Sequence, residues 1–439
     1  MKALPISRSE ADAIFARLAP YPRLALAVSG GPDSLALMLL AARWRDARRA
    51  GPELSVVTVD HRLRPGSRSE AEGVGRAASG LGLGHAILTW KKAELPSASL
   101  QARARTARYH LLAAYCHAHA IPALVTAHTQ DDQAETFLMR LKRGSGLDGL
   151  AAIPEKGLWA GIAIFRPLLD VPKARLVATL DEAGLPFVSD PSNADPRFER
   201  ARMRERTGAL EALGLSPEAL ALSARRLRRA RDALDAASCD FLARHSAMNA
   251  AGYATIDRDA LFVAPQEIAI RALAQLIAAV GGGETPVQLA KLETLLATLA
   301  ANPTKAHTLG RCRLESVSGR LGLFREVRGG GLPIARLRPG ERALWDDRFA
   351  IELGAGEPEP ITVKALGEAG FRALRERSHL MSSVPRLAGR TLPSCWRGEV
   401  LLGLPAIDST ILSESYVLGC RARFVGTGTP SRRDDRAPA

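Results

Sequence analysis

One short run of small and polar residues has the composition of a phosphate-binding loop: Ser29, Gly30, Gly31, Pro32, Asp33 and Ser34. The two glycines allow the backbone to approach an anion closely, so that consecutive amides can face it. The hydroxyl groups of Ser29 and Ser34 can donate to phosphate oxygens, and the Asp33 carboxylate can hold a Mg²⁺ ion that bridges them. A glycine-rich turn with Asp33 as a helix cap is the structural alternative. The six residues together favour phosphate binding.

A second group of chemically capable residues lies at the start of an expected helix, from His128 to Thr136. Asp131 and Glu135 are four residues apart and therefore share one helix face, with Asp132 beside them. Three carboxylates and a histidine in this place can bind a cationic substrate or Mg²⁺. Helix capping explains one or two of the acids, because acids are favoured in a first turn. The whole set therefore indicates a binding site.

Strands and helices in alternation must position both runs. Apolar runs of strand length precede helical patterns over the first half of the chain: Leu24 to Val28, Leu54 to Val59, Ala86 to Trp90 and Ala123 to Ala127. Strands that are apolar throughout predict a parallel, doubly wound α/β sheet with helices on both faces. Ligands of such sheets bind at the carboxyl ends of the strands, where both polar runs stand.

Changes in composition divide the chain into domains. We expect an α/β catalytic domain over residues 1–212, a mainly helical domain over 213–328, a small mixed α/β domain over 332–425 and a disordered tail over 426–439. The helical domain should contain two short strands, over 306–314 and 321–325. Three successive glycines, residues 329–331, supply a linker before the last domain.

Charge and cysteine content limit the classes of function. A formal net charge of +14 suits a polyanionic partner such as nucleic acid, although an arginine-rich proteome gives the same balance. No apolar segment has the length of a signal peptide core or a membrane span. The cysteines stand far apart without a CxxC pair: Cys116, Cys239, Cys312, Cys395 and Cys420. We therefore expect a cytoplasmic protein with reduced thiols and no membrane partner.

The phosphate-binding loop differs from the two best-known nucleotide motifs. It lacks the Lys-Ser/Thr pair of a Walker A motif and the spacing of GxGxxG. Its SGGxDS pattern resembles the signature of the PP-loop ATP pyrophosphatases. That resemblance implies cleavage of ATP between the α- and β-phosphates, transfer of AMP to an oxygen, and Mg²⁺. It also implies that adenine lies at the end of the second strand, beside Asp60 and His61, which would equally serve as ordinary loop residues.

Further runs occur in the order typical of one family within this superfamily, at residues 128–136, 140–150, 166–169 and 190–193. With the loop, they make the stretch from Ala25 to Arg204 resemble the tRNA(Ile)-lysidine synthetases. The resemblance implies that ATP and free lysine convert the first-anticodon-position cytidine of a CAU isoleucine tRNA into lysidine. It implies that Asp131, Asp132 and Glu135 serve lysine or Mg²⁺. By the same resemblance, Asp33 serves Mg²⁺ and phosphate.

Several arginines are candidates for contact with phosphate or tRNA. Arg105 and Arg108, with Tyr109, resemble an arginine-tyrosine run of the family, and a solvated basic face with a packed tyrosine is an equal alternative. Arg200 and Arg204 keep a one-turn spacing after the 190–193 run, but Ala201 stands where the family usually has asparagine. A further stripe occupies an expected helix that begins near residue 217: Arg225, Arg226, Arg228, Arg229 and Arg231. As a whole it fits contact with tRNA, and residue by residue it fits a solvated helix face.

Other classes of protein would share the loop. A tRNA thiolase of the 2-thiocytidine type would carry paired cysteines, and an amidating ligase for small molecules would need ammonia delivery. The chain has no cysteine pair, and Lys2 stands where an N-terminal glutaminase nucleophile would follow Met1. A tRNA-binding protein with a decayed loop is opposed by the intact loop residues. The sequence leaves open whether two copies form a homodimer.

Overall fold

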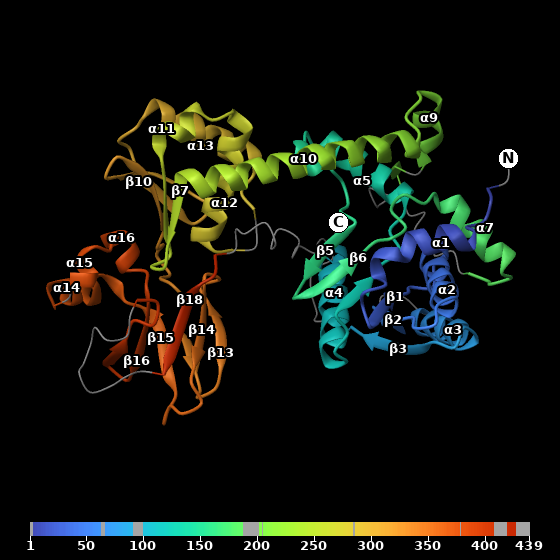
Figure 1. Cartoon of the computed structure of the whole chain (residues 1–439), viewed down its shortest axis with the longest axis horizontal. Helices are drawn as coiled ribbons and strands as arrows, with labels where there is room; N and C mark the ends of the chain where they lie inside the picture. Colours follow the sequence, from blue (N-terminus) through green and yellow to red (C-terminus); the bar gives the residue numbers. More distant parts are fainter. Residues whose placement is uncertain are drawn as a thin grey trace. The chain divides into compact units, whose positions relative to one another are not determined.

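The computed structural model describes residues 3–62, 66–90, 100–187, 202–203, 205–283, 286–377, 379–407 and 419–426. The chain forms two compact units whose boundary falls inside helix α10 (Pro217–His245), between Arg231 and Asp232. Figure 1 labels most of the elements of both units. Over the described residues, no helix is both long enough and apolar enough to cross a membrane. Residues 427–439 of the expected tail and the 190–193 run lie outside the described residues.

The first unit is built on a six-stranded sheet in the order β3-β2-β1-β4-β6-β5. Its strands are β1 (Arg23–Ala27), β2 (Glu53–Asp60), β3 (Gly84–Thr89), β4 (Ala123–Val125), β5 (Lys156–Trp159) and β6 (Ile162–Phe165). Neighbours are parallel except at the edge, where β5 runs antiparallel to β6. The parallel sheet predicted from the apolar runs is confirmed. The sequence carries little signal for β5, because a four-residue edge strand with one glycine has almost no apolar periodicity.

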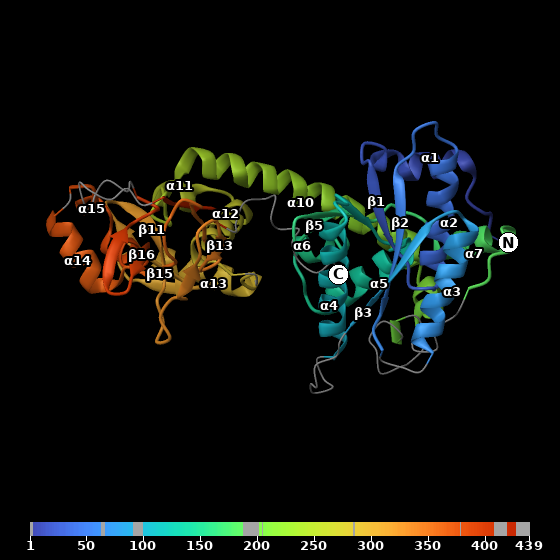
Figure 2. The ribbon, with the colours of Figure 1, turned by 90° about the horizontal axis from the view of Figure 1, so that it is seen from below.

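Helices cover both faces of this sheet (Figure 2). Leu24 and Leu26 of β1 are buried on one face, and Ala25 between them is buried on the other, as the period of two in a strand requires. The helices on the first face are α1 (Arg8–Phe15), α2 (Pro32–Asp46), α3 (Ser67–Gly80) and α7 (Lys173–Glu182). Helix α4 (Leu100–Ala118) covers the second face through Tyr109 and Leu112. Both faces are thus apolar, and the polar runs are confined to the loops that leave the strands.

A smaller apolar cluster joins two further helices of the first unit. Ala134 and Phe137 of α5 (Gln130–Lys142) pack with Leu220 and Ala224 of α10, and with Ala152. Ala152 follows the short helix α6 (Leu147–Leu150), and α9 (Thr207–Ala212) precedes α10. The start of α10 therefore packs against α5.

The second unit begins with a five-stranded antiparallel sheet in the order β7-β8-β11-β10-β9. The strands are β7 (Ser246–Asn249), β8 (Tyr253–Ile256), β9 (His307–Leu309), β10 (Cys312–Val317) and β11 (Arg320–Arg325), and the packed helices are α11 (Arg258–Val263), α12 (Gln266–Gly281) and α13 (Leu289–Ala301). The strand expected over 306–314 is two strands, because Gly310 and Arg311 turn the chain with φ of +57° and +65°. The hairpin β7-β8 carries no sequence signal, since β7 is almost wholly exposed.

Two more antiparallel sheets complete the second unit. They have the orders β12-β15-β16-β17 and β13-β14-β18. The elements are β12 (Ala335–Leu337), β13 (Arg342–Trp345), β14 (Phe349–Leu353), β15 (Ile361–Ala365), α14 (Gly367–Arg377), α15 (His379–Ser382), α16 (Arg386–Gly389), β16 (Pro393–Arg397), β17 (Val400–Gly403) and β18 (Cys420–Phe424). One apolar cluster, which includes Trp345, Phe349 and Val363, is shared by both sheets. The division at residues 328 to 332 remains a prediction.

A buried ionic cluster lies inside the second unit. The side chain of Asp346 is fully buried, and Arg325 donates to its two oxygens at 2.9 and 2.8 Å. Arg348, also fully buried, donates to Asp346 at 2.7 Å and to the carbonyl oxygens of Gly252 and Thr391. The five-stranded sheet and the C-terminal strands therefore share one carboxylate.

Candidate active site

The run from Ser29 to Ser34 lies at the strand-to-helix junction where the sequence predicts it. Strand β1 ends at Ala27, and α2 begins at Pro32 with Gly31 as its N-cap. Gly30 has a φ of +91°, a left-handed conformation that favours glycine, so the tight turn depends on it. The Ser34 hydroxyl donates to the Gly31 carbonyl at 2.9 Å and accepts from the Ser29 amide at 3.1 Å. Ser34 thus shapes the loop from within.

Asp33, in the first turn of α2, has one carboxylate oxygen with a hydrogen-bond partner and one without. Its Oδ2 accepts from the ammonium of Lys173 at 3.1 Å. Its Oδ1 is buried and has no hydrogen-bond partner. Burial raises the pKa of Asp33, and the Lys173 ammonium opposes that rise. A buried carboxylate oxygen with no donor is the kind of atom that a cation satisfies.

The acids of α5 have distinct local partners. Thr129 caps the helix in a capping box, in which its amide donates to Asp132 at 2.9 Å. Asp131 accepts from the backbone amide of Lys173 at 2.8 Å and so receives the start of α7. Glu135 is buried and takes no part in the cap. The capping box therefore involves Asp132 and not Glu135.

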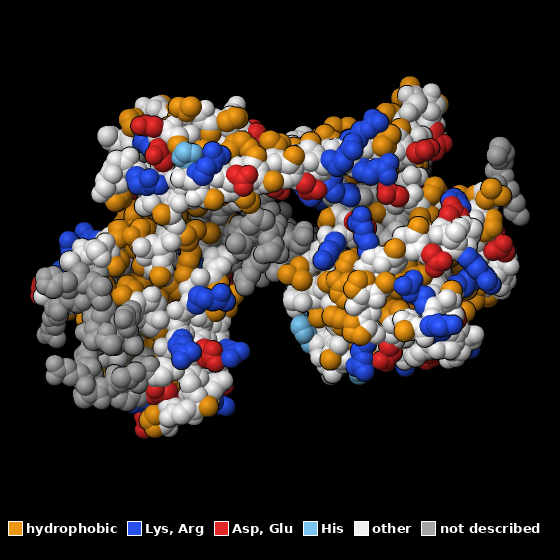
Figure 3. Space-filling view, viewed as in Figure 1, with side chains coloured by type: hydrophobic (Ala, Val, Ile, Leu, Met, Phe, Trp, Pro, Cys, Tyr) orange, Lys and Arg blue, Asp and Glu red, His pale blue; other side chains and the backbone are white. Residues whose placement is uncertain are grey.

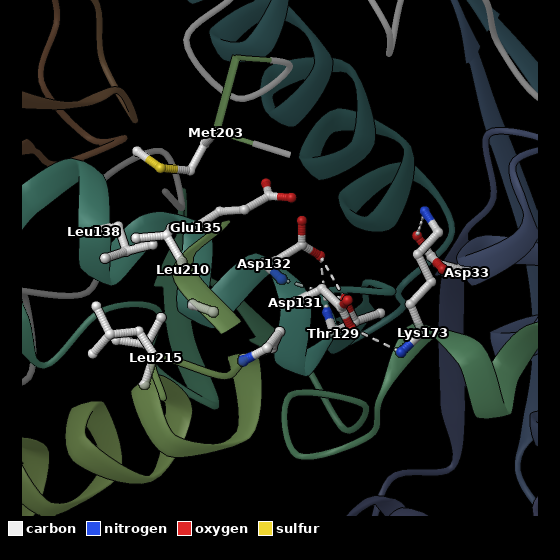
Figure 4. Close-up of a pocket in the computed structure, with 13 residues that line it drawn as sticks. Asp33, Thr129, Asp131, Asp132, Glu135, Leu138, Lys173, Met203, Leu210 and Leu215 are labelled. Atoms are coloured by element: carbon white, nitrogen blue, oxygen red, sulfur yellow. Dashed lines mark hydrogen bonds and ion pairs between the residues drawn. The ribbon is translucent and has the colours of Figure 1, made fainter. Parts of the chain in front are cut away.

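These side chains line one cavity of about 170 Å³ in the first unit (Figure 4). Its polar side consists of Asp33, Thr129, Asp131, Asp132, Glu135 and Lys173. Its apolar side consists of Ala134, Leu138, Met203, Leu210, Leu215, Pro217 and Leu220. Figure 4 shows the carboxylates of Asp132 and Glu135 directed into the same space. Four carboxylates and one ammonium leave the polar side negative, which suits a cationic ligand with an aliphatic body.

A second polar place lies at the end of β2, the strand next to β1. Asp60 accepts from the Ser67 hydroxyl at 2.7 Å and from the Arg62 amide at 3.0 Å. Although burial acts to raise it, these hydrogen bonds lower the pKa of Asp60. His61 lies edge-on to Trp90, and burial lowers the pKa of His61, as does the charge of Arg108. The Nδ1 atom of His61 and the Oδ2 atom of Asp60 are buried without hydrogen-bond partners, so this place can also receive a polar ligand.

Comparison with known proteins decides the family. Residues 5–210 match the PP-loop domain. The chain is 48% identical over 305 residues to the tRNA(Ile)-lysidine synthase of Bradyrhizobium sp. strain BTAi1, over 67% of this chain and 84% of that protein. It is 44% identical over 356 residues to that of Bradyrhizobium diazoefficiens, over 77% of this chain and 97% of that protein. The chain belongs to the tRNA(Ile)-lysidine synthase family.

More distant relatives and solved structures complete the comparison. The tRNA(Ile)-lysidine synthase of Ruegeria pomeroyi is 35% identical over 390 residues, which is 88% of this chain and 89% of that protein. Among solved structures, the U34-tRNA thiolase NcsA from Methanococcus maripaludis overlaps 51% of this chain and 76% of that chain, at 16% identity and a TM-score of 0.42. That overlap is too weak to support an argument about function. Family membership therefore rests on the sequence relatives.

The remaining residues expected at the site lie in different places. The Nδ1 atom of His128 is hydrogen-bonded to the Thr126 hydroxyl at 3.0 Å, and His128 does not line the cavity. Arg105 and Arg108 flank the ring of Tyr109 on α4, each about 5.6 Å from its centre, and neither lines the cavity. The charge of Arg108 lowers the pKa of His61, which follows the end of β2. Arg200 and Arg204 lie outside the described residues.

Lys173 is a charged cavity residue that reasoning from the sequence missed. It is the first residue of α7, and it bonds Asp33 through its side chain and Asp131 through its backbone. It follows the run at residues 166–169 by only a few positions, which is the one signal that pointed to this segment. A single lysine four residues beyond a motif carries no chemical information until the fold brings it to the loop.

The arginine stripe of α10 does not have a uniform role. Arg228 donates to the carbonyl oxygens of Ala151 and Ile153, and Arg225 pairs with Asp170 at 3.4 Å. Arg226 and Arg229 are exposed. Figure 3 shows Lys and Arg side chains gathered over the part of α10 that belongs to the first unit. Contact with tRNA phosphates, expected of the stripe, is therefore available to its outward members only.

Proposed function

We propose that this chain converts the first-anticodon-position cytidine of a CAU isoleucine tRNA into lysidine, with ATP and free lysine as co-substrates. Membership of the tRNA(Ile)-lysidine synthase family supports the reaction. The observation that carries the assignment of residues is the acidic cavity beside the PP-loop, which pairs a phosphate loop with a site for a cationic amine. The reaction has two half-reactions, and both act on the C2–O2 group of the cytidine.

The first half-reaction joins AMP to the tRNA. The cytidine O2 atom attacks the α-phosphorus of ATP, a new P–O bond forms, and the bond to the β-phosphate breaks to release pyrophosphate. The amides of the loop and the positive end of α2 stabilise the charge that develops on the phosphoryl oxygens. Lys173 adds one positive charge at the same place. Asp60 and His61 offer unpaired polar atoms to the adenosine.

The residues near the loop fit a Mg²⁺ ion. Asp33 presents a buried oxygen with no hydrogen-bond donor, and Asp132 is on the same side of the cavity. Within the described ranges, no three histidine, cysteine or acidic side chains converge as a complete metal site. One or two carboxylates with substrate phosphates are the usual ligands of Mg²⁺, so this set suffices. When bound, the ion would neutralise charge on the phosphates.

The second half-reaction makes the carbon–nitrogen bond. The ε-amine of lysine attacks C2 of the activated cytidine, and the C2–O2 bond breaks to release AMP with that oxygen. The amine must lose its proton before attack, and a buried carboxylate is suited to accept it. We assign this position to Glu135, with Asp131 and Asp132 holding the lysine. The apolar side of the cavity would receive the methylene chain.

The cysteines argue against sulfur transfer. None of the five lines the cavity, and Cys116, Cys312, Cys395 and Cys420 are buried as free thiols. Burial raises the pKa of Cys116 to about 11 and that of Cys312 to about 12. A thiol in that state is a poor nucleophile. Nitrogen from lysine is therefore a better second nucleophile than sulfur.

The proposal is tested with labelled lysine and a CAU isoleucine tRNA transcript. We expect ATP-dependent pyrophosphate release and label in the tRNA, with both lost when the anticodon cytidine is changed. The matched control is a methionine tRNA with the same CAU anticodon, which should accept no label. Pyrophosphate release without label in any tRNA, or label incorporated without ATP, would contradict the proposal.

A further inference from the structure

The cavity has two walls that belong to different helices. Asp132, Glu135 and Leu138 come from α5, while Pro217 and Leu220 come from the first turns of α10. Figure 4 shows the leucines of the α9–α10 segment across the cavity from the α5 side chains. The width of the cavity therefore depends on how α10 is held against α5.

Apolar packing alone holds the two helices loosely in register. Leu220, Ala224 and Leu227 form the inward face of α10 and pack against Ala134 and Phe137 of α5. Such contacts bury area, but they are not directional. Burial by itself therefore constrains the exact position of α10 along its axis less than directional bonds do. Directional bonds are needed to fix the position.

Arg228 supplies such bonds from the same inward face, one residue beyond Leu227. Its Nη2 atom donates to the carbonyl oxygen of Ile153 at 2.6 Å and to that of Ala151 at 3.1 Å. Ile153 is fully buried. Two charge-assisted hydrogen bonds to one short segment fix the helix both along its axis and in rotation.

The same carbonyl is bound from the side of α5. Gln133, which is next to Asp132, donates through Nε2 to the Ile153 oxygen at 2.8 Å, and its Oε1 accepts from the Ile153 amide at 2.8 Å. Gln133 is only 4% exposed. The oxygen of Ile153 is thus shared by the helix with the acids and the helix that carries the opposite wall.

The backbone at this node is in an uncommon conformation. Ala152 has a φ of +54°, in the left-handed region that residues with a Cβ atom seldom adopt. Arg140 of α5 donates to its carbonyl oxygen at 3.0 Å. A left-handed alanine persists only where the surrounding bonds over-determine it, and such places are concentrated at functional sites. Here those bonds come from Gln133, Arg140 and Arg228.

We infer that Arg228 is a positioning residue that fixes the spacing between the acidic and apolar walls and so sets the affinity for the acceptor amine. The inference rests on the proposed function, because the amine is lysine only if that proposal holds. The carbonyl groups that Arg228 binds, those of Ala151 and Ile153, belong neither to the loop from Ser29 to Ser34 nor to the lining of the cavity. Its loss should therefore change the lysine requirement and leave the ATP requirement unchanged.

The experiment measures steady-state kinetics of the full chain with Arg228→Met and Arg228→Lys. We expect Arg228→Met to raise KM for lysine about tenfold, with KM for ATP and tRNA affinity within twofold of wild type, because small misplacements at a site cost about tenfold or more. Arg228→Lys keeps one donor, so its KM for lysine should lie between those of wild type and Arg228→Met. Arg228→Met should raise KM less for lysine analogues with shorter chains than for lysine itself.

Arg258→Met is the matched control. Arg258 also donates to two carbonyl oxygens, those of Pro303 and Leu299 at 2.8 and 2.7 Å, but in the second unit. Its removal should lower the melting temperature to a similar extent and leave KM for lysine unchanged. Gln133→Met provides a second route to the same node, and its effect combined with Arg228→Lys should be less than additive, since both bind one oxygen.

The outcomes separate the inference from the function beneath it. If wild type incorporates no lysine, the proposed function fails. If wild type is active but Arg228→Lys and Gln133→Met both leave KM for lysine within twofold, the positioning role is wrong. Weaker tRNA binding with an unchanged lysine requirement would make Arg228 a tRNA contact instead. An equal rise of all KM values in Arg228→Met and Arg258→Met would reduce the role to general stability.

Discussion

Replacing Lys173 by methionine tests the charge balance of the cavity. Lys173 is the one cation among the described residues that line it, beside four carboxylates. Methionine keeps most of the length of the side chain and removes the ammonium that bonds Asp33 at 3.1 Å. The incoming phosphates of ATP would then meet four carboxylates with no protein cation between them. We expect the AMP-transfer step to slow and the lysine requirement to change little.

The magnitude follows from the geometry of the pair. Two unit charges 3.1 Å apart interact by about 5 kcal/mol at an effective dielectric constant of about 20. Lys173 and Asp33 keep 39% and 24% of their side-chain surface exposed, so solvent reduces the worth of this pair to about 1 kcal/mol. A hydrogen bond from the same ammonium to a phosphate oxygen is worth about 1.5–3 kcal/mol. Its loss lowers kcat/KM for ATP about 10- to 150-fold.

The assay is pyrophosphate release with saturating tRNA, followed over a range of ATP concentrations. Lysine is held at saturation, and thermal unfolding verifies that the variant is folded. Lys156→Met is the control, because Lys156 is an exposed lysine of the same unit that lies over Phe165, outside the cavity. The control should keep kcat/KM for ATP within twofold of wild type.

Two results would refute this reasoning. If Lys173→Met keeps kcat/KM for ATP within twofold of wild type, the ammonium does not act on phosphate. If ATP binds more tightly to the variant, Lys173 competes with cations for Asp33 and is an obstacle that the substrate must displace. The second result would leave the cavity assignment intact and reverse the role of its lysine.

Three further changes probe other parts of the molecule. Asp33→Ala should abolish AMP transfer and leave tRNA affinity near that of wild type, and a strong loss of tRNA affinity in filter binding would oppose this role. Glu135→Ala should lower kcat/KM for lysine about 100-fold or more with pyrophosphate release preserved, since it removes the proposed acceptor of the amine proton; an unchanged kcat/KM for lysine would count against it. Asp346→Asn should lower the free energy of unfolding by about 3–5 kcal/mol at neutral pH, because it leaves buried arginines without their carboxylate. Burial acts to raise the pKa of Asp346, but hydrogen bonding from Arg325 and the charge of Arg348 hold that pKa below its usual value. The ionised carboxylate therefore stabilises the wild-type protein above the pKa that Asp346 has in the unfolded chain, and this stabilisation is lost as the pH falls through the pKa of the folded protein. In urea denaturation, the difference in free energy of unfolding between wild type and Asp346→Asn should become smaller in acid. A difference that does not change with pH would exclude an ionic origin of the stabilisation.

The chemistry of the loop and of the acidic helix start was readable from the sequence because each is local. Six contiguous residues make the turn from Ser29 to Ser34, and a strand-to-helix junction needs only the apolar runs on either side. Asp131 and Glu135 share a face through helix periodicity alone. The parallel sheet followed from strands that are apolar throughout, and its carboxyl edge then brought the two runs together.

Tertiary structure decided what depends on contact between distant residues. Lys173 meets Asp33 across 140 positions, and Arg228 meets Ile153 across 75, distances over which no periodicity carries information. The apolar wall comes from the turns around Leu215 and Leu220, whose leucines look like ordinary core residues in sequence. Which arginine of α10 turns inward was likewise set by the packing of Leu220 and Ala224 on α5, because an amphipathic helix shows its apolar face in sequence but not the carbonyl groups it will meet.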